Sequence, residues 1–357
     1  MNAIGETILN RTATSSPAIG APTAAHGSTD AAERTARPAG SINIDLDTLR
    51  DYAPGYGFTF ESDCDPVYEF ALPRFIELLD KLGVPATLFT IGRDAARPAH
   101  ADVLRTAFSA GHEPGNHTMT HPRQLSRMPL DDMRRNIHEC HDIVTQVASR
   151  EPVGFRSPCY DVSGQVLSIL DELKYRYDSS VHPTILGPVV DAVVFLKSRG
   201  KSREWRPGTY CHMFAPLSPY RPSRRSPWRA GGNGDLVEMP LTAVPWTRLP
   251  FYGTWLHTTG KKMFDKALRN IRRAGTLLNF HFHAVELLDL NDPGVDPRFR
   301  VHPGLATPLE ERRALIEEVI LEFKSAYDLV TLAELAERSR ETMKASHVSS
   351  GNSGGIS

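Results

Sequence analysis

The chain has 357 residues, of which 40% are hydrophobic and 23% are charged, so it can bury a substantial core and is not disordered throughout. Its 41 basic and 42 acidic residues give a formal net charge of −1, which argues against a dedicated nucleic-acid-binding protein. Four cysteines without a Cys-x-x-Cys pair argue against a disulfide scaffold and against a structural zinc site.

Both ends of the chain are predicted to be disordered. Residues 1–40 are rich in Ala, Thr, Ser, Pro and Gly and lack the continuous apolar segment of a secretory signal. Residues 341–357 are polar and rich in Gly and Ser. No stretch approaches the roughly 20 apolar residues that span a bilayer. We therefore expect a cytoplasmic protein with one folded domain over residues 41–340, and peripheral contact with the inner membrane face stays open.

Segments with strand and helix periodicity alternate between the two tails. Strands are predicted at 42–47, 85–91, 112–117, 153–156, 175–179, 236–239, 276–283 and 329–330. Helices are predicted at 66–82, 97–110, 129–149, 163–174, 260–274, 308–326 and 331–339. Residues 183–234, rich in Pro, Gly, Arg and aromatic residues, interrupt this pattern and are predicted to form an inserted cap beside a substrate site. The alternation indicates an α/β fold with a parallel sheet that closes, or nearly closes, into a barrel.

Polar residues follow several of these strands, at the end where such barrels carry their active sites. Asp45 and Asp47 lie two residues apart on the first strand, so both carboxylates face the same side. They would repel each other unless a cation or a proton lies between them. His117 and His121 follow a later strand at a spacing that lets two imidazoles hold one metal ion. Two histidines and one carboxylate leave coordination positions open, as catalytic metal sites do.

Two further strand ends carry polar side chains. Arg156 begins the segment Arg-Ser-Pro-Cys-Tyr, where a guanidinium can hold a carboxylate and a turn can direct a backbone N–H at an oxyanion. Asn279, His281 and His283 share one face of a strand, and Phe280 and Phe282 occupy the other. In a barrel the phenylalanines would face the helices and the histidines would face the interior.

In this order, Asp-x-Asp, His-x-x-x-His, Arg-x-Pro and the late strand His resemble the polysaccharide deacetylase family, also called the NodB homology family or carbohydrate esterase family 4. The resemblance covers about residues 41–340. It implies a distorted (β/α)7 barrel and a hydrolase that uses a divalent metal, usually zinc, with cobalt or nickel as alternatives. Such an enzyme removes an N-acyl group, here acetyl or formyl, from an amino sugar.

The resemblance also implies roles for single residues. Asp45 would be the general base, and Asp47, His117 and His121 would be the metal ligands. The one-residue gap between the two aspartates resembles the branch that contains some peptidoglycan deacetylases and the lipid-linked aminoarabinose deformylases. This gap leaves the assignment of base and ligand between Asp45 and Asp47 open.

The remaining roles fall on the later strands. Arg156 would orient Asp45, and the N–H of Cys159 or Tyr160 would bind the oxyanion. His283 would be the general acid, because the Ala-Val-Glu that follows it matches the same branch. His281 is the other candidate for the acid and is expected at least to contact the substrate. Asp178 occupies the family position that orients the acid.

The nature of the substrate stays open. The cap contains an apolar stretch followed by basic residues, which suits either a membrane surface and a lipid-linked, phosphate-bearing sugar or a simple solvated rim. A second enzyme hypothesis is hydrolysis of a non-sugar amide or ureide, because relatives of this fold act on ureides. A third is a non-catalytic carbohydrate-binding module. The sugar, the acyl group, the metal and the oligomeric state are not determined at this stage.

Overall fold

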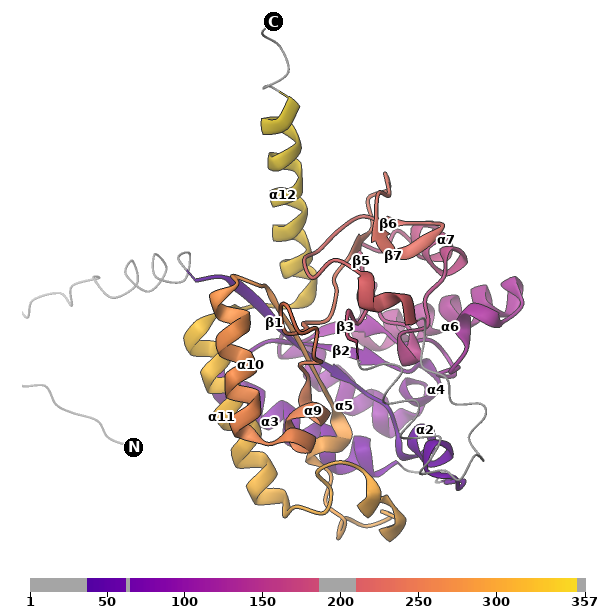
Figure 1. The fold of residues 1–357 in the computed structure, drawn as a ribbon. Helices are drawn as coiled ribbons and strands as arrows, with labels where there is room; N and C mark the ends of the chain where they lie inside the picture. Colours follow the sequence, from indigo (N-terminus) through magenta and orange to yellow (C-terminus); the bar gives the residue numbers. More distant parts are fainter. Residues whose placement is uncertain (1–36, 62–64, 186–209, 352–357) are drawn as a thin grey trace, which may run out of the picture. The chain divides into compact units, whose positions relative to one another are not determined.

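The computed structural model describes residues 37–61, 65–185 and 210–351. Its main sheet has eight strands in the order β10-β1-β2-β3-β4-β5-β8, and β9 also pairs with β1 (Figure 1). Every pairing in this sheet is parallel. The strands are β1 (Ala39–Asp45), β2 (Ala86–Thr90), β3 (Glu113–Asn116), β4 (Gly154–Phe155), β5 (Tyr177–Asp178), β8 (Val237–Glu238), β9 (Leu278–His283) and β10 (Asp328–Leu329).

Helices follow most of these strands. The α-helices are α2 (Leu49–Tyr52), α3 (Leu72–Leu82), α4 (Gly92–Ala95), α5 (Pro98–Ser109), α6 (Leu130–Ala148), α7 (Gly164–Glu172), α9 (Gly253–Thr259), α10 (Lys261–Arg273), α11 (Leu309–Ala326) and α12 (Leu332–Gly351). A π-helical turn, η2 (Val67–Ala71), leads into α3. Short 3₁₀ helices are η1 (Ala53–Tyr56), η3 (Leu125–Arg127), η4 (Pro158–Tyr160), η5 (Tyr210–Phe214), η6 (Ala284–Leu287) and η7 (Pro297–Val301).

The sheet curls until the segment after β8 meets β9. The backbone N–H of Thr242 donates to the carbonyl of Asn279 at 3.0 Å, and the Asn279 side chain donates to the carbonyl of Met239 at 2.8 Å. These bonds join the two ends of the curled sheet. The predicted α/β barrel architecture is therefore confirmed.

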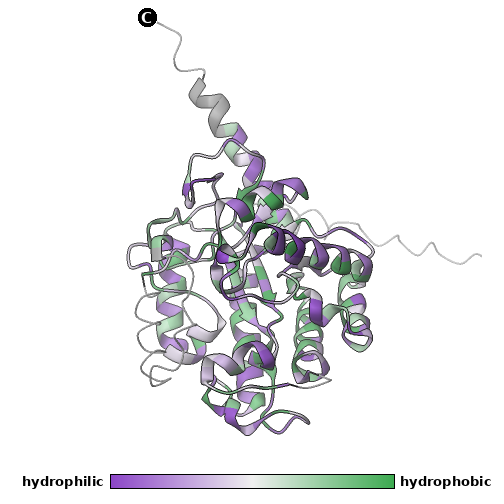
Figure 2. Ribbon diagram, turned by 90° about the vertical axis from the view of Figure 1, so that its right-hand side faces the viewer, coloured by the Kyte–Doolittle hydropathy of each residue, from purple (hydrophilic) through white to green (hydrophobic). Residues whose placement is uncertain are grey.

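Side chains of the central strands point alternately to the two faces of the sheet, so one face lies in the hydrophobic core and the other faces the interior of the barrel. On β9, Phe280 and Phe282 are fully buried in the main hydrophobic cluster, which includes residues of α3, α10 and α11. Figure 1 shows these three helices side by side, and ion pairs such as Lys261 with Glu322 join them. Polar and apolar residues alternate along the covering helices (Figure 2), as expected when one helix face packs on a sheet. The opposite face of β9 is thus free to carry histidines.

The start of α12 closes the barrel at the amino ends of the strands. The Glu113 carboxylate accepts hydrogen bonds from the Ala333 backbone N–H at 2.9 Å, from Thr87 at 2.7 Å and from the Tyr177 hydroxyl at 2.7 Å. A carboxylate at the N-terminus of a helix satisfies otherwise unpaired N–H groups and is favoured by the helix dipole. Helix α12 therefore covers the end of the barrel opposite to the carboxyl ends of the strands, where the candidate site residues lie.

The structure differs from the sequence prediction at several boundaries. Helix α12 continues to Gly351, so the tail expected at 341–357 begins inside a helix. Strand β1 begins at Ala39, inside the tail expected at 1–40. Helix α9 was not predicted, because its seven residues are too few to show a clear helical period.

The inserted cap is described only in part. Residues 186–209 of the expected insertion lie outside the described residues, as do residues 1–36 of the expected tail. The rest of the insertion contains η5 and an antiparallel hairpin of β6 (Pro222–Ser223) and β7 (Ser226–Ala230). Within the described ranges, no helix is long and apolar enough to cross a membrane.

Gly154 in β4 tests the packing of the barrel interior. A Cβ atom at this position would lie 1.9 Å from the Tyr177 ring, which is fully buried and bonded to Glu113. We expect Gly154→Ala to lower the free energy of unfolding by about 1–3 kcal/mol or more, measured by urea denaturation. Gly234→Ala is the matched control, because nothing lies within 4 Å of its Cβ position. Equal stabilities of the two variants would contradict this packing.

Candidate metal and acid–base site

The residues singled out by their motifs meet at the carboxyl ends of the strands. Asp45 is the last residue of β1, and His283 is the last residue of β9 directly opposite it in register. His117 follows β3, and Arg156 follows β4. Asp178 is the last residue of β5. The curled parallel sheet therefore brings side chains from distant parts of the sequence to one edge.

Asp47, His117 and His121 form a compact cluster. The Nε2 atoms of both histidines lie 3.3 Å from Asp47 Oδ1, and the three candidate ligand atoms lie within 4.8 Å of one another. The Nδ1 atom of His117 lies 2.7 Å from the carbonyl oxygen of Arg156. A carbonyl can only accept, so Nδ1 carries the proton and the Nε2 lone pair faces Asp47.

The donor set of this cluster fits a divalent metal ion. Asp47 Oδ1 is buried and has no hydrogen-bond donor among the described residues. Burial by itself would raise the pKa of Asp47, but the charges and contacts of His121 and His117 outweigh it and hold the pKa well below its usual value. Two imidazole nitrogens and one carboxylate oxygen match the ligands of catalytic zinc, which keeps a fourth position open.

The histidine pair is held by a loop that follows β3. Thr118 and His121 have left-handed backbone angles, with φ of 67° and 54°. The Asn136 side chain on α6 accepts hydrogen bonds from the backbone N–H groups of Met119 and Thr120 at 2.9 and 3.2 Å. Asn116 accepts from the N–H of Thr118 at 2.8 Å. The strained loop is thus anchored between the two histidines by Asn116 and Asn136.

A second carboxylate lies behind His121. Its Nδ1 atom is 3.7 Å from Asp51 Oδ1, and Asp51 in turn accepts hydrogen bonds from the backbone and hydroxyl of Thr48 and from Arg93. A carboxylate behind a ligating imidazole is the usual way to orient it and raise its basicity. Sequence reasoning missed Asp51, although the Thr-x-x-Asp spacing is a helix capping signal.

A buried ion pair holds Asp45. Arg156 is fully buried and donates from Nη1 to Asp45 Oδ1. Its Nε and Nη2 atoms donate to the carbonyl and hydroxyl of Ser179 at 3.0 and 2.9 Å. The guanidinium also lies 4.1 Å from the centre of the Phe89 ring. The structure therefore places Arg156 in contact with Asp45, as the resemblance implied.

His283 is charged by its surroundings. Burial would lower the pKa of His283, but the Glu286 carboxylate, with Asp47 and Asp45, outweighs it and raises the pKa to about 9. His283 Nδ1 is 3.7 Å from Glu286 Oε1 and 3.4 Å from the Thr254 hydroxyl. Burial opposes the charge on Glu286 as well, but its contacts with His257 and His283 lower its pKa to about 2.

Asp178 does not contact His283 within the described residues, and Glu286 takes that position instead. Asp178 accepts a hydrogen bond from Ser180, whose hydroxyl accepts from the backbone N–H of Ser157 at 2.8 Å. Burial raises the pKa of Asp178 to about 6. Asp178 therefore does not orient the proposed acid, although this was expected. Through Ser180 it holds the backbone of the segment that follows Arg156. Glu286 lies only three residues from His283, a local contact that the Ala-Val-Glu context had indicated without a role.

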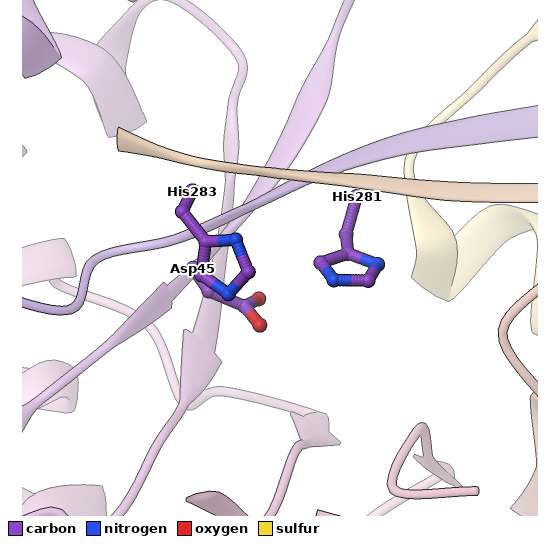
Figure 3. Close-up of side chains that lie close together, drawn as sticks. All are labelled: Asp45, His281 and His283. Atoms are coloured by element: carbon purple, nitrogen blue, oxygen red, sulfur yellow. The ribbon is translucent and has the colours of Figure 1, made fainter. Parts of the chain in front are cut away.

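His281 occupies a different environment from His283 on the same strand face. Figure 3 shows His283 beside the Asp45 carboxylate and His281 to one side of it. Burial holds the pKa of His281 well below its usual value, so the ring is neutral. Its Nε2 atom lies 3.0 Å from the Tyr160 hydroxyl, and the ring stacks on Tyr252 at 5.0 Å. These contacts leave His283 as the charged member of the pair.

Asp45, His281 and His283 could also be considered as metal ligands, because their ligand atoms lie within 4.8 Å of one another. However, the Asp45 carboxylate already contacts the Arg156 guanidinium, and His283 is protonated beside Glu286. A metal ion there would meet two existing positive charges. This cluster therefore fits a metal ion less well than Asp47, His117 and His121 do.

Backbone hydrogen bonds in the segment after Arg156 distinguish the two candidate oxyanion donors, the N–H groups of Cys159 and Tyr160. The backbone N–H of Tyr160 already donates to the Ser157 carbonyl at 3.1 Å. The N–H of Cys159 makes no hydrogen bond within the described part of the chain, so it is the available donor of the two. Burial raises the pKa of the Cys159 thiol to about 12, so it stays protonated and is a poor nucleophile.

Comparison with known proteins supports the expected resemblance. The polysaccharide deacetylase family model matches residues 56–177. A chitooligosaccharide deacetylase of Sinorhizobium fredii is 38% identical over 90 residues, which cover 25% of this chain and 39% of that protein. A peptidoglycan deacetylase of Helicobacter pylori is 22% identical over 147 residues, which cover 40% of this chain and 48% of that protein. This chain thus spans less than half of the length of these curated relatives, and it resembles the polysaccharide deacetylase family, as its motifs predict.

Solved structures agree on the fold. A Mycobacterium smegmatis protein described as a polysaccharide deacetylase aligns with a TM-score of 0.52 and 19% identity, over 86% of this chain and 92% of that one. PuuE allantoinase aligns with a TM-score of 0.51 and 15% identity, over 84% of this chain and 89% of that one. At these identities the likeness establishes the barrel and not the activity.

The metal cluster can be tested by removing one ligand. We expect zinc-loaded wild-type protein to hold about one ion per chain by elemental mass spectrometry, and His117→Ala to lose most of it, because two ligands remain. His138→Ala, a partly exposed histidine of α6, is the control and should keep its metal. Full metal retention in His117→Ala would exclude this cluster as the site.

Proposed function

We propose that this chain, which resembles the polysaccharide deacetylases, is a metal-dependent hydrolase that removes an N-acyl group from an amino sugar. The observation that carries the proposal is the position of two clusters on one edge of the barrel. Asp47, His117 and His121 provide three metal-ligand atoms, and Asp45 with His283 provides a base and a charged acid beside them. Together these groups can activate a water molecule and protonate a leaving amine, which are the two tasks of metal-assisted amide hydrolysis.

Asp47, His117 and His121 would hold the metal through one carboxylate oxygen and two Nε2 atoms. The bound ion would lower the pKa of a water molecule and polarise the acyl oxygen. Asp51 would keep the His121 ring oriented, and the Arg156 carbonyl would fix the tautomer of His117. Zinc suits this ligand set best, with cobalt or nickel as alternatives.

Asp45 would accept the proton of the attacking water. Its carboxylate is held by the buried Arg156, so it keeps one orientation without paying for rearrangement during the reaction. The Cys159 N–H would donate to the oxyanion that develops on the acyl oxygen, and Tyr160 and His281 would form the adjoining wall that contacts the sugar.

His283 would give its proton to the leaving amine. An amine leaves poorly as an anion, so the reaction needs a donor that is protonated at neutral pH. Glu286 supplies this condition by raising the pKa of His283 to about 9. The products are a carboxylic acid and a free amino sugar.

The first substrates to test are N-acetyl and N-formyl amino sugars, as single sugars, oligomers and lipid-linked precursors. Release of acetate or formate identifies the acyl group. Hydrolysis of a ureide such as allantoin, with no release from any amino sugar, would favour the non-sugar amide hydrolase instead. Binding of sugars without any turnover of the metal-loaded protein would favour a carbohydrate-binding module.

Asp45→Asn separates the proposed base from the metal ligands. We expect it to lower kcat for acyl release by about 10²- to 10⁴-fold, because the amide cannot accept the proton, and to keep the wild-type zinc content. Arg156 retains its bonds to Ser179, so the variant should fold, which circular dichroism can check. Near-normal kcat, or loss of zinc, would assign Asp45 another role.

Glu286→Gln tests the acid through its pH dependence. The pKa of His283 is raised by Glu286, so wild-type activity should persist at neutral pH and fall as the pH rises through about 9. Removing the carboxylate charge lowers this pKa, so the basic limb of the kcat profile should move to lower pH. The variant should therefore lose more activity at pH 8 than at pH 6. An unchanged basic limb would show that His283 is not the acid.

A further inference from the structure

A cavity opens beside the metal cluster on the side of His121. It has a volume of about 240 Å³, and its lining includes Arg50, Asp51, Glu61, Arg93, His121 and Arg123. Three guanidinium groups and two carboxylates thus surround a space that borders a proposed metal ligand. The volume is sufficient for a substituent of a sugar but small for a whole sugar ring with its neighbours.

Two of the charges in this cavity neutralise each other. Arg93 Nη2 lies 3.1 Å from both oxygens of Asp51 and 2.9 Å from Asp94, which is buried next to it. Asp51 also accepts from the backbone and hydroxyl of Thr48. Arg93 and Asp51 are therefore occupied with each other and with their neighbours.

At the outer rim, Arg50 lies 3.6 Å from Glu61, and their side chains are 47% and 80% exposed. Such a pair is weak and well solvated, and it adds little net charge to the cavity. The rim therefore neither attracts nor repels an anion strongly.

Arg123 is the charge that remains. One of its nitrogens, Nη2, donates to the backbone carbonyl of Asp51 at 2.7 Å. Within the described residues, no carboxylate lies within ion-pair distance of its guanidinium. The single bond to the backbone holds the side chain in place without neutralising it, so the remaining N–H groups can bind a ligand at low entropic cost.

The charge of Arg123 also reaches the reacting groups. Burial raises the pKa of Cys159 to about 12, and Arg123 is the largest influence in the opposite direction. Arg123 and His121 line the same cavity, so the guanidinium can meet a substituent that extends from the metal cluster.

We propose that Arg123 binds an anionic substituent of the amino-sugar substrate, a carboxylate or a phosphate, inside this cavity. The proposal rests on the proposed function and narrows its substrate class to acidic amino sugars. A planar guanidinium pairs with either anion through two parallel hydrogen bonds. Sequence reasoning placed basic residues in the inserted cap and did not single out Arg123, because an arginine after His-x-x-x-His-Pro looks like an ordinary loop residue.

The test compares matched neutral and acidic probes on zinc-loaded protein. The carboxylate arm uses N,N′-diacetylchitobiose against the disaccharide of N-acetylglucosamine and N-acetylmuramic acid, which adds a lactyl group. The phosphate arm uses N-acetylglucosamine against N-acetylglucosamine 1-phosphate. Calorimetry measures the dissociation constant of each probe, and acetate release is followed separately. The proteins are the wild type, Arg123→Gln and, as the control, Arg127→Gln, which changes an exposed arginine of the nearby helix η3.

We expect the wild type to bind one acidic probe about 10- to 100-fold more tightly than its neutral partner. Arg123→Gln should remove this preference and leave the neutral probe nearly unchanged, and Arg127→Gln should keep the preference. A wild type without preference or binding in either arm would overturn the proposal. Equal weakening of both probes by Arg123→Gln would do the same, since it would indicate a structural role. Absence of acetate release from every probe would count against the proposed function, while the binding comparison would still decide the role of Arg123.

Discussion

The buried pairing of Arg156 with Asp45 is the constraint on which the rest of the site depends. Removing a guanidinium and a carboxylate from water is costly unless every remaining hydrogen-bonding group is satisfied. Here Ser179 accepts hydrogen bonds from the other two nitrogens of the guanidinium, and the Phe89 ring lies against it. The backbone carbonyl of Arg156 accepts a hydrogen bond from His117. One residue after β4 therefore fixes both the proposed base and the tautomer of a proposed metal ligand.

Position within the barrel gives chemically identical side chains different properties. His281 and His283 lie on the same face of β9, yet burial keeps the first neutral and Glu286 keeps the second charged. The same contrast separates the carboxylates. Asp47 stays ionised between two imidazoles, whereas burial raises the pKa of Asp178 to about 6 beside Ser180. An acid, a base and a ligand set can thus be built from only two residue types.

Much of this arrangement could be predicted from local patterns. Alternation on β1 and β9 indicated which side chains face the interior, and parallel strands bring their carboxyl ends to one edge, so the meeting of Asp47, His117 and His121 was expected. The prediction was less successful where contacts come from loops. The left-handed loop at Thr118, the carboxylate of Asp51 and the true neighbour of His283 depend on packing against α2, α6 and η6, which no local period reveals.

The sequence by itself indicated a parallel α/β barrel and the chemical types that reach the carboxyl ends of its strands, because periods of two and of about 3.6 residues report directly on buried faces. Only the tertiary structure decided that Glu286 and not Asp178 contacts His283. Among the described residues, it also decided that the Cys159 N–H is available where that of Tyr160 is not, and that no carboxylate pairs with Arg123. The burial of a group and the charges around it depend on residues that are distant in the chain, and the folded barrel is what brings these residues together.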